Sequence, residues 1–167
     1  RALYEPALII LTSDHGEALG DHGEETHGLF AYEATLHIPL VVWFRGKVAP
    51  GSSDEFVRHI DIAPTVLAAA GVKKPAALHG SSLLEKPAAP RETYFEAFST
   101  ALNRGWAPLR GVIAEGKKFV DLPVPELYDL APDPAEKSNL AVAQSELVRR
   151  FARLLPAESA LGHARRP

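Results

Sequence analysis

An aspartate and a histidine stand side by side where an apolar run ends. The run covers residues 6–11, is rich in branched side chains and is too short for a helix, so it predicts a strand buried on both faces. Asp14 and His15 then lie beyond the carboxyl end of that strand, at the edge where open α/β sheets bind ligands. A carboxylate oxygen and an imidazole nitrogen suit Mn, Zn or Fe, and also Ca or Mg if further carboxylates join. The pair therefore indicates a divalent metal site.

The segment that follows, residues 16–28, is an acidic loop rich in histidine, in which glycines interrupt any continuous helix. Two protein ligands hold a metal weakly, so further ligands must come from elsewhere. The local candidates are Glu17, Asp21, His22 and His27. In the alternative interpretation, Asp14 caps the following turn, His15 fills a core site and the acidic loop is merely solvated. The residues alone leave both interpretations open.

The first half of the chain contains the elements that would position these residues. Residues 40–44 predict a second core strand that begins just after a proline. A helix is expected from Asp61, as N-cap, to Gly71. We therefore expect residues 1–72 to form part of an α/β core, and residues 73–90, rich in Pro, Ala and Ser, to form a crossover linker.

The second half predicts a small α+β subdomain over residues 91–155. Four short candidate strands cover residues 92–98, 109–114, 118–121 and 126–129. A helix over 144–155 has the apolar spacing of an amphipathic element. Residues 156–167 are expected to be a frayed tail. The fold class is thus α/β, with a mixed sheet and flanking helices followed by a small antiparallel sheet and a helix.

Composition narrows the possible partners. The chain has 167 residues, 46% hydrophobic content, a formal net charge of -3 and no cysteine. Its scattered Lys and Arg form no basic stripe, so nucleic acid is an unfavoured partner. No apolar run approaches the roughly 20 residues of a membrane-spanning helix. Because the chain enters a core strand almost at once, we expect it to be cut from a longer protein.

Five motifs in one order resemble the C-terminal part of the sulfatase family, within the alkaline phosphatase superfamily. They are TSDHGEALGDHG, the THG that holds His27, HIPLVVW, HIDIAPTVLAAAGV and ELYDLAPDPAEKSNLA. The match as a whole spans roughly residues 6–140. The resemblance implies an alkaline-phosphatase-like mixed sheet. It also implies that Asp14 and His15 are ligands of one catalytic divalent metal, Ca or else Mn or Zn.

The resemblance assigns His27 to a position, Lys or His in the family, that contacts the nonbridging oxygens of a sulfate or phosphate ester. A cationic donor there stabilises the charge that grows in the transition state and can protonate the leaving group. His22 is a second candidate for substrate binding. His37 and His59 are expected to form hydrogen bonds that support the site. Arg110 either lines the cleft or pairs with a carboxylate.

One part of the family pattern is missing. Sulfatases carry a C/S-x-P-S-R motif, whose Cys or Ser matures to formylglycine, and this chain has no such motif. A formylglycine or a Ser/Thr nucleophile is therefore expected in a missing N-terminal part, and this chain alone is expected to be inactive. The resemblance favours a periplasmic or extracellular location. The alternatives are a phosphonate or phosphate ester hydrolase, a phosphoethanolamine transferase, or a non-catalytic binding domain.

Overall fold

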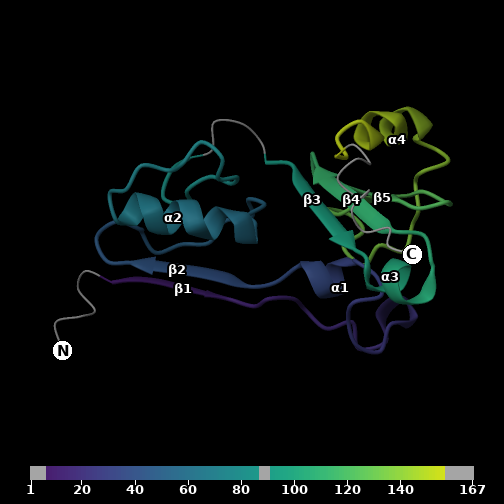
Figure 1. Ribbon diagram of the computed structural model, residues 1–167, viewed down its shortest axis with the longest axis horizontal. Helices are drawn as coiled ribbons and strands as arrows, with labels where there is room; N and C mark the ends of the chain where they lie inside the picture. The colour runs from purple at the N-terminus through teal and green to yellow at the C-terminus, as the bar shows by residue number, and fades with distance from the viewer. Residues whose placement is uncertain (1–6, 87–90, 157–167) are drawn as a thin grey trace. The chain divides into compact units, whose positions relative to one another are not determined.

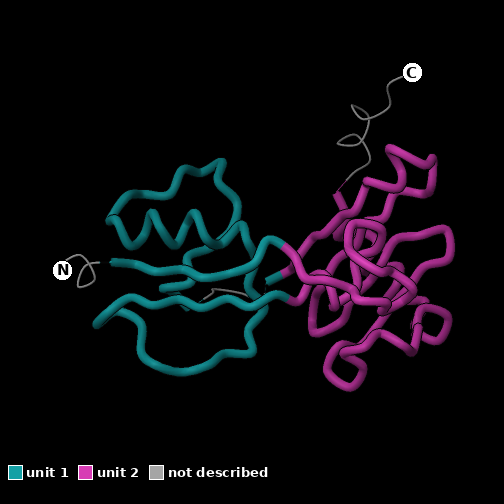
Figure 2. The backbone as a smooth tube through the Cα atoms, turned by 90° about the horizontal axis from the view of Figure 1, so that it is seen from below, with its two compact units in different colours: residues 1–14, 38–91 teal, residues 15–37, 92–167 magenta. Residues whose placement is uncertain are grey.

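The computed structural model describes residues 7–86 and 91–156, so most of the predicted tail and the end of the predicted linker lie outside the described residues. The chain divides into two compact units, coloured separately in Figure 2. The first comprises the described residues of 1–14 and 38–91, and the second those of 15–37 and 92–167. The acidic loop therefore groups with the C-terminal sheet, whereas the predicted boundaries assigned it to the N-terminal core.

The first unit is built on a two-stranded antiparallel ribbon. Strand β1 (Leu8–Thr12) pairs with β2 (Leu40–Phe44), with Ile10 opposite Val42. A short 3-10 turn, η3 (His59–Asp61), leads into helix α2 (Ile62–Ala69), which packs against β1 (Figure 1). The predicted strands and helix are therefore present at nearly the predicted residues.

The expectation that the first strand is buried on both faces is wrong for the described residues. Ile9 and Leu11 are 42% and 65% exposed, and their antiparallel neighbours Trp43 and Val41 on the same face are 39% and 54% exposed. The reason is geometric: alternate side chains of a strand point to opposite faces, and only one face of this ribbon packs on α2.

Asp61 does not cap helix α2 as expected. No side-chain cap hydrogen bond forms there. The Asp61 carboxylate is fully buried and instead accepts hydrogen bonds from the Arg58 guanidinium and from the backbone N–H of Ser81. Burial by itself raises the pKa of Asp61, but these donors outweigh it and hold the pKa below its usual value. A buried carboxylate takes a charged partner in preference to a helix end.

The second unit is a four-stranded antiparallel meander with the order β3-β4-β5-β6. The strands are β3 (Thr93–Ala97), β4 (Leu109–Ala114), β5 (Lys117–Asp121) and β6 (Glu126–Asp129), close to the four predicted ranges. Glu115 and Gly116 both have positive φ, which is the conformation of a tight hairpin turn between β4 and β5. A short helix, α3 (Ser99–Arg104), was not predicted.

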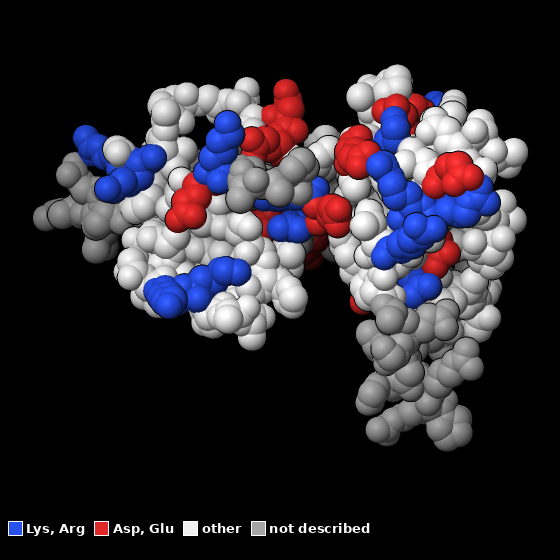
Figure 3. Space-filling model, turned by 90° about the horizontal axis from the view of Figure 1, so that it is seen from above, with Lys and Arg blue, Asp and Glu red and all other residues white. Residues whose placement is uncertain are grey.

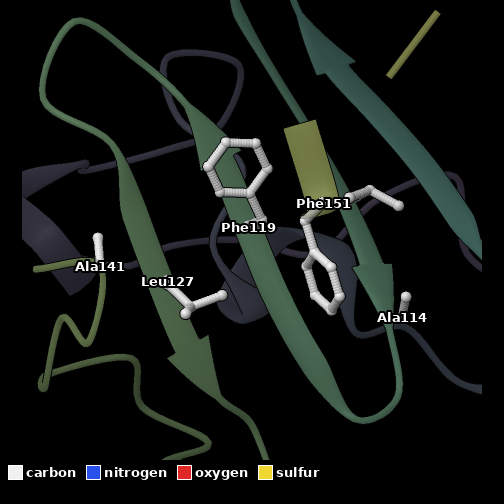
Figure 4. Close-up of a cluster of buried hydrophobic side chains, with 6 residues drawn as sticks. Ala114, Phe119, Leu127, Ala141 and Phe151 are labelled. Carbon is white, nitrogen blue, oxygen red and sulfur yellow. The ribbon is translucent and has the colours of Figure 1, made fainter. Parts of the chain in front are cut away.

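Both faces of this sheet are covered. On one face, Phe119 and Leu127 pack with Phe151 of helix α4 (Ser145–Ala152), as Figure 4 shows. On the other face, Phe95 and Val120 pack with Ala31, which lies between the acidic loop and helix α1 (Glu33–Leu36). This connecting segment therefore completes the core of the second unit, and the acidic loop that precedes it groups with the C-terminal sheet.

Charged side chains on the surface of the second unit are largely paired. Arg110 lies 2.9 Å from Asp121, and Arg150 lies 2.5 Å from Glu115. In the view of Figure 3, Lys and Arg groups are interspersed with Asp and Glu. Across the part of the chain that the structure describes, no helix has both the length and the apolar character needed to cross a membrane.

Candidate functional site

The end of β1 is held in place by two hydrogen bonds from side chains. The Thr12 hydroxyl donates to the carbonyl of Pro39 at 2.9 Å, and Nε2 of His59 donates to the carbonyl of Ser13 at 2.7 Å. The framework hydrogen bond expected of His59 is thereby present. These contacts fix the backbone that carries Asp14, whose carboxylate lies 3.4 Å from the Ser13 hydroxyl.

The ring of His15 is oriented by its own neighbour. Its Nδ1 lies 2.8 Å from the carbonyl oxygen of Gly16, and because a carbonyl can only accept, Nδ1 must carry the proton. The neutral ring then has its lone pair on Nε2. Gly16 is required for close packing, since a Cβ there would lie 2.2 Å from the carbonyl oxygen of Ala34. The Gly16 N–H also donates to the carbonyl of Thr35 at 2.8 Å.

His27 lies against His15 although twelve residues separate them. The two ring centroids are 3.9 Å apart with an interplanar angle of 31°. Nδ1 of His27 is 3.1 Å from a carboxylate oxygen of Glu17, and both side chains are partly exposed. The Ala18 N–H donates to the carbonyl of Thr26 at 2.8 Å, which closes the loop and brings the two segments together. The structure thus groups His15, Glu17 and His27.

His22 lies apart from that group. Its ring stacks on Tyr32 at a centroid distance of 3.6 Å, and its Nε2 donates to the carbonyl of Glu136 at 3.1 Å. The side chain is 19% exposed, and its Nδ1 lies 3.1 Å from an Asp21 carboxylate oxygen. None of these contacts tests the predicted substrate-binding role of His22, which stays a prediction.

The acidic loop also contains a carboxylate that is not solvated. Glu24 is only 2% exposed and accepts hydrogen bonds from the backbone N–H groups of Leu29 and Phe30, at 2.7 and 3.2 Å. This side chain folds the loop back on itself just beyond His27. The alternative of a merely solvated loop is therefore wrong for this residue.

Two residues that matter for this loop were missed in the sequence. Glu136 stands in a segment with Asp133 and Asn139, whose residue types are typical of turns and caps. Asp133 does act in this way, because it accepts the N–H groups of Lys137 and Ser138, and these bonds lower its pKa. Glu136 is instead buried and lies 2.8 Å from Nζ of the buried Lys118. The available signal was the Lys117–Lys118 pair, because in a strand one of two consecutive lysines must face inward.

The described residues meet some, but not all, of the requirements of a metal site. A histidine that donates one ring N–H to a backbone carbonyl offers its other nitrogen to a metal, and His15 has this arrangement with Gly16. Within residues 7–86 and 91–156, no three His, Asp or Glu side chains form a group that could hold a metal ion. Any metal bound here would therefore need ligands beyond these described residues.

Comparisons with known proteins match the same region. The family model described as Sulfatase matches residues 1–72. The "Multifunctional alkaline phosphatase superfamily protein PehA" of Trinickia caryophylli is 34% identical over 192 residues, which cover 97% of this chain and 37% of PehA. The chain thus spans little more than a third of that relative.

Solved structures share the fold. BT4656, in complex with its substrate D-glucosamine-2-N,6-O-disulfate, aligns with a TM-score of 0.75 at 28% identity, covering 89% of this chain and 33% of that one. The phosphonate monoester hydrolase of Agrobacterium radiobacter aligns with a TM-score of 0.70 at 27% identity, covering 88% of this chain and 34% of that one. The predicted fold class is confirmed by these neighbours.

Proposed function

This chain belongs to the sulfatase family within the alkaline phosphatase superfamily, and from that premise we propose that the full-length protein is a metal-dependent hydrolase of sulfate esters. In this proposal the chain supplies metal and substrate ligands of the active site, but not the nucleophile. The observation that carries the proposal is the contact between His15 and His27, at a ring-centroid distance of 3.9 Å. It puts the proposed metal ligand beside the proposed substrate ligand.

Asp14 and His15 are proposed as ligands of one divalent metal ion, Ca or else Mn or Zn. The Gly16 carbonyl supports this role, because a metal-binding histidine typically donates its other ring N–H to a backbone carbonyl, as Nδ1 of His15 does here. The bound ion would supply Lewis-acid stabilisation of the ester oxygens. The remaining ligands would come from the part of the protein that relatives have and this chain does not span.

His27 is proposed to contact the nonbridging oxygens of the ester and to protonate the leaving group. Glu17 holds Nδ1 of His27 at 3.1 Å, so Nε2 is the ring atom that remains for the substrate. A donor fixed in this way stabilises the charge that develops as the ester bond breaks. His22, whose side chain is 19% exposed, is the second proposed substrate ligand.

The nucleophile is proposed to lie in the N-terminal part of the full-length protein, as formylglycine or as a Ser or Thr. The chain spans about a third of its relatives' length, and the x-P-S-R signature is missing from it. The 167-residue chain alone should therefore not hydrolyse sulfate esters. By analogy with bacterial sulfatases, we propose a periplasmic or extracellular location for the full-length protein.

The test uses the full-length protein with metal analysis and an aryl sulfate assay. Asp14→Ala and His15→Ala should each abolish bound metal and lower kcat at least about 1000-fold, since a lost metal removes the main electrostatic contribution. Asp54→Ala, an exposed aspartate in the same unit, is the matched control and should retain both. Full activity and metal content in Asp14→Ala would overturn the proposal.

A second candidate function is phosphonate or phosphate ester hydrolysis. It is favoured by the likeness to the Agrobacterium radiobacter phosphonate monoester hydrolase, which nearly equals the likeness to BT4656. Parallel kcat/KM measurements on aryl sulfate, phosphate and phosphonate esters decide between them. A preference of about 100-fold or more for the phosphonate ester would replace sulfate as the proposed substrate. A metal-free protein inactive on all three would favour a binding role.

A further inference from the structure

A lysine of the C-terminal sheet is buried beneath the segment that joins the acidic loop to helix α1 (Glu33–Leu36). Lys118 is fully buried, and the strand register puts it on the sheet face that this segment covers, beside Tyr128. Its Nζ lies 2.8 Å from Oε1 of Glu136 and 3.5 Å from Oε1 of Glu33. The rings of Tyr32 and Phe95 lie 5.7 and 5.3 Å from the ammonium. Two carboxylates and two aromatic rings thus surround one buried cation.

Glu136 binds the acidic loop at His22 and the start of helix α1 at Glu33. Its Oε2 accepts the backbone N–H of Glu33 at 2.5 Å, and its own carbonyl accepts Nε2 of His22 at 3.1 Å. One bond uses the side-chain carboxylate of Glu136 and the other its backbone carbonyl. The backbone of Glu136 is left-handed, with φ +52°. In the sequence, His22 and Glu33 stand on either side of His27. The loop segment that carries His27 is therefore tied at both ends to a single residue of the C-terminal subdomain.

Stability alone is a weak reason to bury this pair. Taking an ammonium and a carboxylate out of water is costly, and apolar replacements are often as stable. Burial raises the pKa of Glu136, and the Lys118 ammonium opposes that rise. What the pair provides that an apolar contact cannot is direction, because each hydrogen bond fixes the loop at a defined atom.

We propose that Lys118 and Glu136 are positioning residues that hold His27 in place for the reaction, by fixing the loop on both sides of it. This inference rests on the proposed function for the role of His27. It assigns the C-terminal subdomain a part in the chemistry although neither residue touches the substrate.

Hydrogen exchange in the full-length protein tests the first half of the proposal. In Lys118→Met and in Glu136→Gln, the amides of Ala18, Leu29 and Phe30 should exchange at least tenfold faster, because their bonds close the loop. The amides of β4 and β5 should keep their protection. Arg150→Met, which removes the exposed ion pair with Glu115, is the matched control. Unchanged loop amides, or equal losses in loop and strands, would overturn the proposal.

A double-mutant cycle tests whether the effect passes through His27. Lys118→Met should lower kcat about 10- to 100-fold, the range expected from misplacing a reacting group by an ångström, with KM changed less. In a His27→Ala background the same change should lower kcat less than about twofold, because the group being positioned is gone. An equal loss in both backgrounds would show a merely structural role and overturn the inference.

Further comparisons distinguish a failure of this inference from a failure of the proposed function or of folding. If a single variant does not fold, the double variant Lys118→Met with Glu136→Met removes both buried charges and gives the same exchange comparison. If the protein hydrolyses no ester, the proposed function fails while the exchange result still decides whether the two residues hold the loop. If Asp14→Ala abolishes hydrolysis but the loop amides stay protected in Lys118→Met, only this inference fails.

Discussion

The β1–β2 ribbon and the β4–β5 hairpin reverse the usual relation between composition and burial. The ribbon strands read LIILT and LVVWF, yet every second side chain is exposed. Strand β5 reads KKFVD, yet its second lysine is fully buried. The difference lies in the covering layers: the hairpin has α4 on one face and the segment after the acidic loop on the other, whereas among the described elements it is α2 that packs against the ribbon strand β1. Burial in this chain thus depends on which elements stack, and hydrophobicity along a strand does not predict it.

The contrast also separates two ways of holding a candidate ligand. Asp14 follows a strand whose outer face is apolar and exposed, and its backbone is held by Thr12 and His59. His27 lies in a loop that is followed directly by Phe30 and Ala31, which form part of a closed core. We expect the first arrangement to need the rest of the full-length protein, and the second to be complete within this chain.

The largest effect should come from truncating a fully buried ring. Phe119→Ala should lower the free energy of unfolding by about 4 kcal/mol, because it leaves a cavity between the sheet and α4. Leu11→Ala, at 65% exposure, should cost less than about 1 kcal/mol in this 167-residue chain. Urea unfolding measures both. Equal costs would break the comparison, and a Leu11→Ala cost above about 2 kcal/mol in the full-length protein would show that the ribbon is covered there.

The buried carboxylate of the first unit should come next. Asp61→Asn should cost about 3 kcal/mol, because the Arg58 guanidinium loses a buried charged partner. The lowered pKa also predicts a pH dependence. A group whose folded pKa lies below its unfolded value stabilises the fold above the unfolded pKa, near 3.8, and loses this effect as the pH falls.

Wild-type stability should therefore fall more than that of Asp61→Asn between about pH 5 and about pH 2. Thermal unfolding of both proteins across this range gives the comparison. Parallel losses in the two proteins would exclude Asp61 as the source of the acid sensitivity.

A smaller effect is expected where the second sheet is most tightly packed. A Cβ at Gly111 would lie 2.3 Å from the carbonyl oxygen of Phe119 and 2.3 Å from Cζ of Phe95. Gly111→Ala should therefore cost about 2 kcal/mol by overpacking. Gly51→Ala, where nothing lies within 4 Å, is the matched control and should be neutral. If Gly111→Ala left the free energy of unfolding in urea unchanged, the Phe95 ring and the neighbouring strand would be able to move aside at little cost.

The smallest effect should be a gain in stability. Glu115 has φ +53° in the β4–β5 turn, a conformation that asparagine adopts far more readily before glycine. Glu115→Asn should add about 0.5 kcal/mol, because the ion pair it loses with Arg150 is exposed and contributes little. Thermal unfolding of the variant checks the sign. A loss of stability would mean that the surface ion pair outweighs the turn.

The local elements followed from the sequence. Short strands between turn residues, the Gly116 hairpin and the spacing of Leu147, Val148 and Phe151 each encode a local preference, and the structure has the corresponding elements. The grouping of His15 with His27 could be expected only from the resemblance, since twelve residues of loop can fold in many ways. The contact between Lys118 and Glu136 was not predicted, because it depends on the strand register and on a turn some 18 residues later. A local sequence pattern contains neither.

The sequence by itself determined where strands and helices form, and it placed Asp14 and His15 just beyond a strand, because backbone preferences and side-chain periodicity act over a few residues. Only the tertiary structure decided which strand faces are covered, to which unit the acidic loop belongs and which groups Glu136 contacts. Those outcomes depend on contacts between residues far apart in the chain, where one buried charge must find its partner.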